Sequence, residues 1–484
     1  MKVSKIFNEI NIGIKNDIDI NKIEIDSRKV TKNDFFIAIK GYEKDGHDYI
    51  DDAIKNGASV ILINEDRLND FIDRKVIILA TKDTRKMLSK LACNYYNNPS
   101  KDFTLIGITG TKGKTLTSFI IKNILNKANK KVGLIGTVAT YIGDKKIKYN
   151  DNTTPEPIEL QESFDLMRKN KCEYVVIEVS SQSLKLGRVN DSYFDIGLFL
   201  NLTEEHVSKN EHKNMKEYFK CKSLLFDMVN KGYINIDDRY GKKLFRKNKK
   251  ISKSFSINNK SNKQAYDIKV TDSYTKFKTT VYGKEEEFIF PLIGDFLVYD
   301  FLGAISICED LNIDINSIKE GIKTVVVPGR EERVENDLGY NIIIDYAHNS
   351  SSLENVLRTF KSIKKGRLIT VFGCAGNRGK TKRKEMGKIS GTYSDYTIIT
   401  EDNPQTEDPN DICKEIEEGI KEITSNYEII IDRKKAIIKA IEMATKDDII
   451  LLAGKGHETY QIIGNEKVPF SEKEIVLDTL KTIK

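Results

Sequence analysis

A glycine-rich loop with a lysine and several threonines stands between an apolar run and an amphipathic stretch at residues 103–125. The run FTLIGI precedes it, Gly110 and Gly113 open a tight turn, and from Lys114 onward apolar residues recur at helical spacing. This order predicts a strand, a phosphate loop and a helix. The loop amides and the helix N-terminus attract phosphate, the lysine reaches the outer phosphates, and the Thr115 hydroxyl can ligate Mg²⁺. The expected ligands are a nucleoside triphosphate and magnesium.

The glycine spacing differs from the general phosphate loop G-x-x-x-x-G-K-[ST], which requires glycine where Ile108 stands. The pattern G-x-T-G-T-x-G-K-T of this chain resembles that of the Mur ligases, which build the stem peptide of peptidoglycan, and of their folylpolyglutamate synthase relatives. By this resemblance the loop holds ATP. The residues concerned are Thr109, Gly110, Thr111, Lys112, Gly113, Lys114 and Thr115.

A second set of polar residues follows a buried strand. The stretch CEYVVIEVSSQSLKLGRV at residues 172–189 reaches Glu178 and then hydroxyl residues. Ligands of open α/β sheets bind beyond the carboxyl ends of strands, and a carboxylate is a hard oxygen ligand suited to Mg²⁺. The alternative for Glu178 is a helix N-cap or a salt-bridge partner. The resemblance assigns Glu178 to the magnesium site.

The segment at residues 198–226 adds a histidine and a lysine. LFLNLTEEH resembles the family block N-[LI]-[ST]-x-[DE]-H, and on that match His206 is a second magnesium ligand. Lys222 aligns with the lysine that the family carbamylates. A bare ammonium would repel metal ions, whereas an N-carboxylated lysine is an anion that can bind them. Spacing alone does not select Lys222, which otherwise is one of many helical surface lysines.

Two stretches resemble segments of the Mur ligases that bind the UDP-linked substrate, and the first resembles the segment that holds its uridine nucleotide. In IDSRKVTKNDFFIAI, Ser27 and Arg28 would face UDP, whereas without the resemblance Asp26 and Ser27 are simply turn formers. The other stretch is DNTTPEPIELQ at residues 151–161. The resemblance assigns the UDP-sugar peptide also to Thr153, Thr154, Ser180 and Arg188.

Five loops of the last third resemble those of the Mur ligases that add the third stem-peptide residue, in the same order. They are PGREERVE, DYAHNSSSLENVL, FGCAGNRGKTKRKEMG, TEDNPQTEDP and AGKGHETYQ. The match implies that ATP is approached by Arg330, Asp345, His348, Arg378 and Lys382. A strand-end loop that faces a triphosphate needs cations, which favours this role over a solvated surface for NRGKTKRK.

The added amino acid depends on two of these loops. Members that take meso-diaminopimelate carry D-N-P-R where this chain has DNPQ, and Gln405 lacks the charge with which an arginine binds a second carboxylate. Glu458 in GKGHE nevertheless matches the diaminopimelate type, in which this glutamate meets the distal ammonium. We slightly favour L-lysine, or another diamino acid with one carboxylate, over meso-diaminopimelate. The resemblance assigns the amino acid to Asp402, Asn403, Gln405, Gly454 and Glu458.

The chain must position these loops with three domains. Turn formers end a small mixed domain at residues 1–98, expected to bind the UDP substrate. A central ATP-binding P-loop domain follows at 99–328. From 329 to 484 apolar β runs alternate with helical stretches, which indicates parallel βαβ units. This Rossmann-like domain lacks G-x-G-x-x-G, so a dinucleotide is not expected. The resemblance implies that it binds the amino acid. The fold class is therefore α/β with the three-domain Mur ligase architecture.

Composition and charge limit the kinds of partner and the cellular location that we expect. The 484 residues exceed one ordinary core, and 39% hydrophobic beside 31% charged residues describes a globular chain. The start lacks a signal peptide and no apolar run reaches 18 residues, so we expect a cytoplasmic protein without membrane association. We also expect a monomer. Charges are spread without a basic, aromatic-rich block, so no nucleic-acid partner is expected. Six scattered cysteines without C-x-x-C indicate reduced thiols.

The resemblance implies an ATP-dependent amide ligase of peptidoglycan precursor synthesis. It would activate the D-glutamate side chain of UDP-N-acetylmuramoyl-L-Ala-D-Glu as an acyl phosphate, which the α-amine of a free amino acid then attacks. One segment departs from the family, because asparagines associated with adenine are replaced by Leu297 and Asp300. This departure keeps open a ligase of the same fold with another carboxylate acceptor. A non-catalytic relative that binds nucleotide or precursor is a further alternative.

Overall fold

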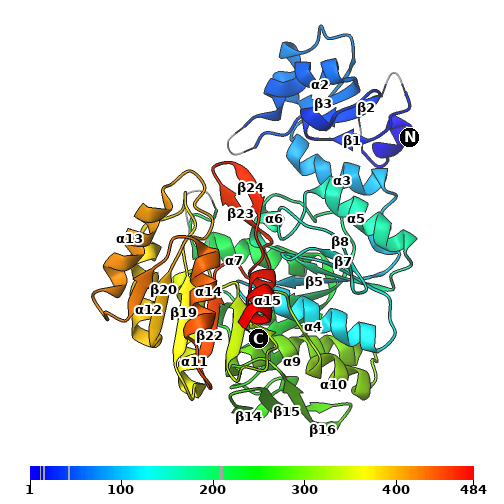
Figure 1. Cartoon of the computed structure of the whole chain (residues 1–484). Helices are drawn as coiled ribbons and strands as arrows, with labels where there is room; N and C mark the ends of the chain where they lie inside the picture. The colour runs from blue at the N-terminus through cyan, green and yellow to red at the C-terminus, as the bar shows by residue number, and fades with distance from the viewer. Residues whose placement is uncertain (11, 15–16, 42–43, 206–210, 484) are drawn as a thin grey trace. The chain divides into compact units, whose positions relative to one another are not determined.

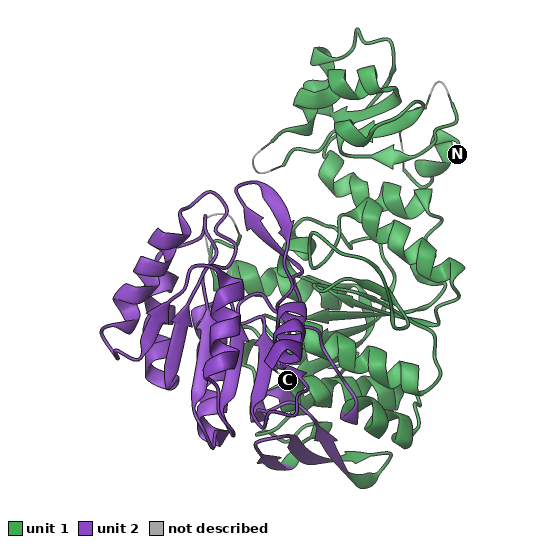
Figure 2. Ribbon diagram, viewed as in Figure 1, with its two compact units in different colours: residues 1–266, 279–286, 298–322 green, residues 267–278, 287–297, 323–484 purple. Residues whose placement is uncertain are grey.

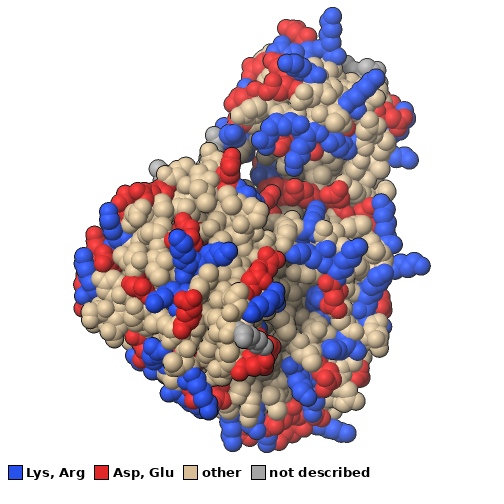
Figure 3. Space-filling view, in the orientation of Figure 1, with Lys and Arg blue, Asp and Glu red and all other residues tan. Residues whose placement is uncertain are grey.

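The chain divides into two compact units, shown in separate colours in Figure 2. The computed structural model describes residues 1–483 except 11, 15–16, 42–43 and 206–210. Unit 1 comprises residues 1–266, 279–286 and 298–322, and unit 2 comprises residues 267–278, 287–297 and 323–484. No helix of the described residues combines the length and the apolar character needed to cross a bilayer. On the face shown in Figure 3, basic and acidic side chains are interspersed.

Unit 1 begins with a four-stranded parallel sheet in the order β1-β2-β3-β4. Its strands are β1 (Ile23–Glu24), β2 (Asp34–Ile37), β3 (Ala58–Asn64) and β4 (Ile77–Thr81). Helix α2 (Ile50–Asn56) covers one face, and α1 (Val3–Ile6) with α3 (Thr84–Tyr95) covers the other. Along β3, Leu62 packs in the core under α3 and Ile61 in the core under α2, as the two-residue period of a strand requires.

The rest of unit 1 is built on a nine-stranded sheet in the order β13-β12-β11-β10-β5-β9-β6-β7-β8. Its strands are β5 (Thr104–Thr109), β6 (Val132–Ile135), β7 (Thr140–Ile142), β8 (Lys145–Lys148), β9 (Tyr174–Glu178), β10 (Phe194–Phe199), β11 (Val229–Asn235), β12 (Ser252–Ser256) and β13 (Lys263–Gln264). Pairing is parallel from β13 to β6 and antiparallel for β7 and β8. Because β5, β9 and β10 are neighbours, the segments that follow them meet at one edge of the sheet.

Helices cover both faces of this sheet (Figure 1). On one side lie α4 (Lys114–Lys127) and α9 (Val298–Asp310), which pack against each other. The other side carries a large apolar core with contributions from α5 (Pro157–Lys169), α6 (Ser181–Lys185), α7 (Met215–Ser223) and α8 (Arg239–Asn248). Strand β5 is buried on both faces, which explains its nearly continuous apolar sequence.

Unit 2 contains a six-stranded sheet in the order β17-β18-β22-β19-β20-β21, parallel except for β17. Its strands are β17 (Glu332–Val334), β18 (Asn341–Asp345), β19 (Leu368–Phe372), β20 (Tyr396–Ile399), β21 (Tyr427–Ile429) and β22 (Ile449–Ala453). One face is covered by α11 (Ser350–Ile363), α12 (Thr381–Tyr393) and α13 (Pro409–Ile420), the other by α14 (Arg433–Met443) and α15 (Glu472–Ile483) (Figure 1). The Rossmann-like alternation expected from the sequence is confirmed.

The remaining elements are short. They are β14 (Tyr266–Val270), β15 (Thr275–Val281), β16 (Lys284–Phe290), α10 (Ile315–Lys323), and the antiparallel hairpin of β23 (Tyr460–Ile463) and β24 (Glu466–Pro469). The hairpin lies directly after the loop AGKGHE.

Candidate active site

The phosphate loop follows β5 and leads into α4, as predicted. Gly113 precedes the helix with a φ of +86°, in the left-handed region that favours glycine. A Cβ at this position would lie 2.1 Å from Oδ1 of Asp300, so the buried carboxyl of α9 fills the space beneath the glycine. Burial raises the pKa of Asp300 to about 7. The family departure at Asp300 is therefore in contact with the loop itself.

Asn201, in the segment that follows β10, forms hydrogen bonds with the phosphate loop. The carbonyl oxygen of Asn201 accepts from the Thr111 N–H at 3.0 Å, and its Oδ1 accepts from the Lys112 N–H at 2.9 Å. On the β9 side, the Thr109 hydroxyl donates to the carbonyl of Val179 at 2.9 Å. Sequence analysis did not single out Asn201, although it opens the quoted block NLTEEH. The loop is thus held in shape before any phosphate binds.

Two lysines converge on one carbonyl of the loop. Lys114 Nζ donates to the oxygens of Gly110 at 2.9 Å and Thr111 at 3.1 Å, and Lys222 Nζ donates to the same Gly110 oxygen at 2.7 Å. Lys222 is 1% exposed, so the alternative of a surface lysine is wrong. Burial and the neighbouring Lys114 hold the pKa of Lys222 well below its ordinary value. This shift favours the neutral amine relative to the ammonium.

Glu178 closes the site at the end of β9. It is fully buried, and Oε2 accepts from the hydroxyls of Thr115 and Thr137, each at 2.9 Å. Burial raises the pKa of its carboxyl. The N-cap alternative is not observed, because the cap of α6 is Ser180, whose hydroxyl accepts from the Ser183 N–H at 3.1 Å. Thr115 and Glu178 thus meet, as their assignment to one metal ion requires.

These residues fit a magnesium ion. A hydroxyl and a carboxylate are the hard oxygen donors that Mg²⁺ selects, and a nearby cation would stabilise the buried carboxylate in its charged form. Among the described residues there is no group of three or more His, Cys, Asp or Glu that could hold a metal. An ion bound at Thr115 and Glu178 would complete its shell with phosphate and water oxygens. His206, the expected second ligand, lies outside the described residues.

Three of the residues expected at the UDP-sugar peptide are joined to the end of β9. The Thr154 hydroxyl donates to the carbonyl of Glu178 at 2.8 Å and accepts from the Ser180 N–H at 3.0 Å. Arg188 donates to the Thr154 carbonyl at 2.9 Å and pairs with Glu156 at 2.7 Å. The Thr153 hydroxyl lies 3.1 Å from that of Thr137, which itself bonds Glu178.

Ser27 and Arg28 lie in the N-terminal sheet, directly after β1. Asp26 caps a short 3₁₀ helix there by accepting from the Arg28 N–H at 3.1 Å, so Asp26 does form a turn. The Arg28 side chain is exposed and pairs with Asp26 at 2.7 Å. Ser27 is buried. A role for Ser27 at UDP stays a prediction.

In unit 2, the residues expected to approach ATP gather around Tyr346. Its ring lies 4.6 Å from the ring of His348 and 4.8 Å from the guanidinium carbon of Arg330. Asp345 ends β18 and accepts from the Glu331 N–H at 2.9 Å. Burial, which outweighs the opposing effect of Arg330, raises the pKa of Asp345. Burial and, to a smaller extent, Arg330 and Lys382 lower the pKa of His348, so Lys382, in the first turn of α12, lies near this group. Arg378 lies on an exposed loop.

The loops after β20 and β22 meet in unit 2 and bring together the residues expected to bind the amino acid. Asn403 Nδ2 donates to Glu458 Oε2 at 3.0 Å. Gly454 has a φ of +117°, and a Cβ there would lie 2.5 Å from Asp402 Oδ2. Gln405 is held through its backbone, which exchanges hydrogen bonds with the β23–β24 hairpin. The predicted set is thus assembled in one place.

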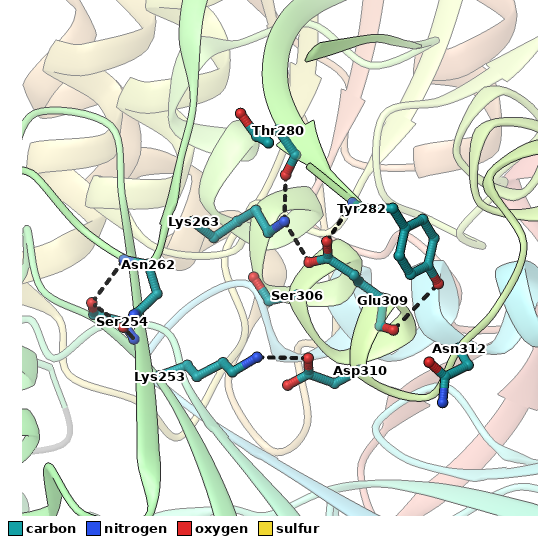
Figure 4. A pocket seen from close by; sticks show the side chains of 10 residues that line it. All are labelled: Lys253, Ser254, Asn262, Lys263, Thr280, Tyr282, Ser306, Glu309, Asp310 and Asn312. Carbon is teal, nitrogen blue, oxygen red and sulfur yellow. Dashed lines mark hydrogen bonds and ion pairs between the residues drawn. The ribbon is translucent and has the colours of Figure 1, made fainter. Parts of the chain in front are cut away.

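A separate cavity of about 440 Å³ lies in unit 1 beside β12, β13 and the end of α9 (Figure 4). Lys263 pairs with Glu309 at 2.5 Å and Lys253 with Asp310 at 2.7 Å across its walls. These cations and anions neutralise one another, so the four side chains offer a ligand little uncompensated charge.

Known proteins match this chain along its whole length. Residues 19–96 match the Mur ligase family catalytic domain, residues 108–308 the Mur ligase middle domain, and residues 329–456 the Mur ligase glutamate ligase domain. UDP-N-acetylmuramoyl-L-alanyl-D-glutamate–2,6-diaminopimelate ligase of Clostridioides difficile is 44% identical over 97% of each chain. The enzyme of the same name, numbered 1, from Clostridium acetobutylicum is 42% identical over the full length of both.

Solved structures agree with these matches. A UDP-N-acetylmuramoyl-L-alanyl-D-glutamate–2,6-diaminopimelate ligase structure aligns over 100% of this chain and 99% of its own, with 25% identity and a TM-score of 0.71. MurF ligase from Thermotoga maritima in complex with ADP covers 96% of this chain and 97% of its own, with 18% identity and a TM-score of 0.59, and shares the fold. The chain therefore belongs to the Mur ligase family, with its three-domain α/β architecture, and it is a ligase.

Proposed function

We propose that this ligase uses ATP to join 2,6-diaminopimelate to UDP-N-acetylmuramoyl-L-Ala-D-Glu in peptidoglycan precursor synthesis. The observation that carries the proposal is 44% identity, over 97% of both chains, to a relative that bears this activity in its name. The names of the relatives favour diaminopimelate over the L-lysine that Gln405 slightly favoured. Glu458, matched to the distal ammonium, suits either amino acid. The ligase would act in the cytoplasm as a monomer.

The three domains would divide the binding of the substrates among them. Residues 1–98, with Ser27, would bind the uridine nucleotide, and residues 99–328 would bind ATP and the rest of the precursor. Residues 329–484 would bind the amino acid. Within unit 2, Arg330, Asp345 and His348 are proposed to contact ATP, which their clustering around Tyr346 supports.

The first chemical step joins two anions. A D-glutamate carboxylate oxygen would attack the γ-phosphorus of ATP, forming an acyl phosphate as the bond to ADP breaks. Lys114 and the loop N–H groups would offset the repulsion, with Lys114 exchanging its loop carbonyls for phosphate oxygens. Magnesium, when bound at Thr115 and Glu178, would supply further neutralisation of the phosphate charge. The α-amine of the amino acid would then attack the acyl carbon, and phosphate would leave as the amide forms.

Lys222 is proposed to act as a carbamate. A neutral amine can attack carbon dioxide, forming an N–C bond and losing one proton, whereas an ammonium has no lone pair. Burial beside Lys114 favours the neutral amine. The resulting anion could accept from Lys114 and bind a second metal ion together with His206.

A ligase of the same fold with another acceptor is the second candidate. The observation that favours it is Asp300 against Gly113 in the phosphate loop, where the family has asparagine. It predicts turnover without the UDP-muramoyl precursor.

The test is phosphate release by the purified protein with ATP, Mg²⁺ and UDP-N-acetylmuramoyl-L-Ala-D-Glu. The amino acids compared are meso-diaminopimelate, L-lysine, L-ornithine and neutral amino acids. We expect release with meso-diaminopimelate. Release with L-lysine alone would correct the amino acid, and no release with any member, from folded protein that binds ATP, would favour the second candidate.

A further inference from the structure

Unit 2 contains a fully buried lysine among the loops proposed to bind the amino acid. Lys455 follows β22, and its side chain is 0% exposed. Its Nζ lies 2.9 Å from Asn403 Oδ1, 2.9 Å from Glu458 Oε2 and 3.9 Å from Asp402 Oδ1. A buried ammonium is costly unless it is paired and hydrogen-bonded, and here its partners are acceptors. Sequence analysis passed over this lysine.

Lys455, Asn403 and Glu458 form a closed triangle. Asn403 Oδ1 accepts a hydrogen bond from Lys455 Nζ, and Asn403 Nδ2 donates to Glu458 Oε2 at 3.0 Å. These two bonds fix the orientation of the Asn403 amide. The N–H of Ile462 also donates to Asn403 Oδ1 at 3.0 Å, so the triangle is tied to β23. The backbone of Gln405 pairs with the same strand. The Lys455 side chain therefore connects the loop after β22 to the loop after β20, and these are the two loops proposed to select the amino acid.

The triangle engages one oxygen of Glu458 and leaves acceptor capacity on the other. Oε2 accepts from both Lys455 and Asn403. Oε1 lies 3.4 Å from the Tyr346 hydroxyl, longer than an ordinary hydrogen bond. An ionised carboxylate oxygen can accept more than one donor. By formal charge, Asp402, Glu458 and Lys455 together carry one net negative charge, which suits a ligand ammonium.

We propose that Lys455 is a positioning residue for the acceptor amino acid, because it locks Asn403 and Glu458 together and presents Glu458 Oε1 to the distal ammonium. The inference rests on the proposed function. Lys455 itself does not touch the amino acid. Its second effect is to keep Glu458 charged.

The charge of Glu458 depends on its neighbours. Burial acts to raise the pKa of this carboxyl, but Lys455, Asn403 and His457 together hold it below the ordinary value. Tyr346 also faces Glu458, and Arg330 and Asp402 act on Tyr346 in turn. Without Lys455, burial would dominate and the pKa would rise. As the pH is lowered, Glu458 would then become protonated, and lose its attraction for an ammonium, at a higher pH than in the wild type.

The experiment is steady-state kinetics of the full-length Lys455→Met enzyme with ATP, UDP-N-acetylmuramoyl-L-Ala-D-Glu and meso-diaminopimelate. We expect the KM for the amino acid to rise about tenfold or more, with KM values for ATP and the precursor within about twofold. The acid limb of kcat/KM for the amino acid should shift to higher pH. Lys439→Met, at an exposed lysine of α14, is the matched control and should change none of these.

A double substitution separates positioning from general damage. If Lys455 acts through Glu458, adding Lys455→Met to Glu458→Gln should change the KM for the amino acid little beyond Glu458→Gln alone. Lys455→Gln, which keeps a hydrogen-bond donor but removes the charge, serves if Lys455→Met does not fold, and it should show the same pH shift.

Three outcomes would count against the inference. Unchanged amino-acid KM and pH profile in Lys455→Met and Lys455→Gln would overturn it while wild-type turnover upholds the ligase. An equal loss for all three substrates would also overturn it. A wild-type enzyme silent with every diamino acid would overturn the proposed function, and this inference with it.

Discussion

Two buried lysines, one in each unit, show how surroundings decide what an amine can do. Lys222 is 1% exposed and Lys455 is 0% exposed. Burial and, after it, the neighbouring Lys114 hold the pKa of Lys222 well below its ordinary value, although its amine also donates to a backbone carbonyl. Lys455 instead pairs with the Glu458 carboxylate at 2.9 Å. Two equally buried lysines thus have different partners: Lys222 lies beside another cation, which disfavours its charged form, and Lys455 lies beside a carboxylate.

The largest expected effect tests the reactive amine. Lys222→Ala should lower kcat by about 100-fold or more, because it removes the group proposed to become an anion beside the metal. Added bicarbonate or a short carboxylate should restore part of the activity by supplying that anion. The measurement is phosphate release with each additive. Lys220→Ala, at an exposed residue of the same helix, is the control. Full activity of Lys222→Ala would remove the contrast between the two lysines.

The second test compares the two lysines by stability. Lys455→Met should lower the free energy of unfolding by about 3 kcal/mol, because it leaves a buried carboxylate without its cation. Lys222→Met should raise it at pH 7, because it removes an amine whose pKa burial and Lys114 lower in the folded state. Denaturant unfolding without bicarbonate measures both. Effects of the same sign would contradict the comparison.

The pH dependence sharpens this test. Between the lowered pKa of Lys222 and the ordinary value of 10.5, the unfolded chain binds a proton that the folded chain does not. The contribution of Lys222 to stability is therefore unfavourable in this window, and the penalty shrinks as the pH approaches 10.5. The gain from Lys222→Met should shrink in parallel. A gain that is constant with pH would mean that Lys222 titrates normally.

The smallest expected effect concerns the amino-acid side of the comparison. Gln405→Arg adds a cation beside the loops that Lys455 braces, and it should improve kcat/KM for meso-diaminopimelate relative to L-lysine by about 10-fold, through a bidentate pair with the second carboxylate. The two substrates are compared in the same enzyme preparation. An unchanged ratio of kcat/KM for the two amino acids would show that position 405 does not select the amino acid.

Much of the fold could be predicted from the sequence because it depends on local patterns. Apolar runs that alternate with helical stretches marked the parallel strands of the C-terminal sheet, and the glycines and Lys114 marked the phosphate loop. The antiparallel strands β7 and β8 were not predicted, since a short polar strand such as KKIK carries little periodic signal. The added amino acid was also not decided, because Gln405 and Glu458 indicated different ligands.

What the sequence by itself determined is the set of chemical groups and their order: a phosphate loop, a carboxylate at a strand end, and loops that match one family. Only the tertiary structure decided which lysines are buried and what they meet. Lys222 reaches a carbonyl 112 residues earlier in the chain, and Lys455 reaches Asn403 across 52 residues. Burial and pairing arise from such distant contacts, and they set whether an amine is charged. No local pattern of residues contains that information.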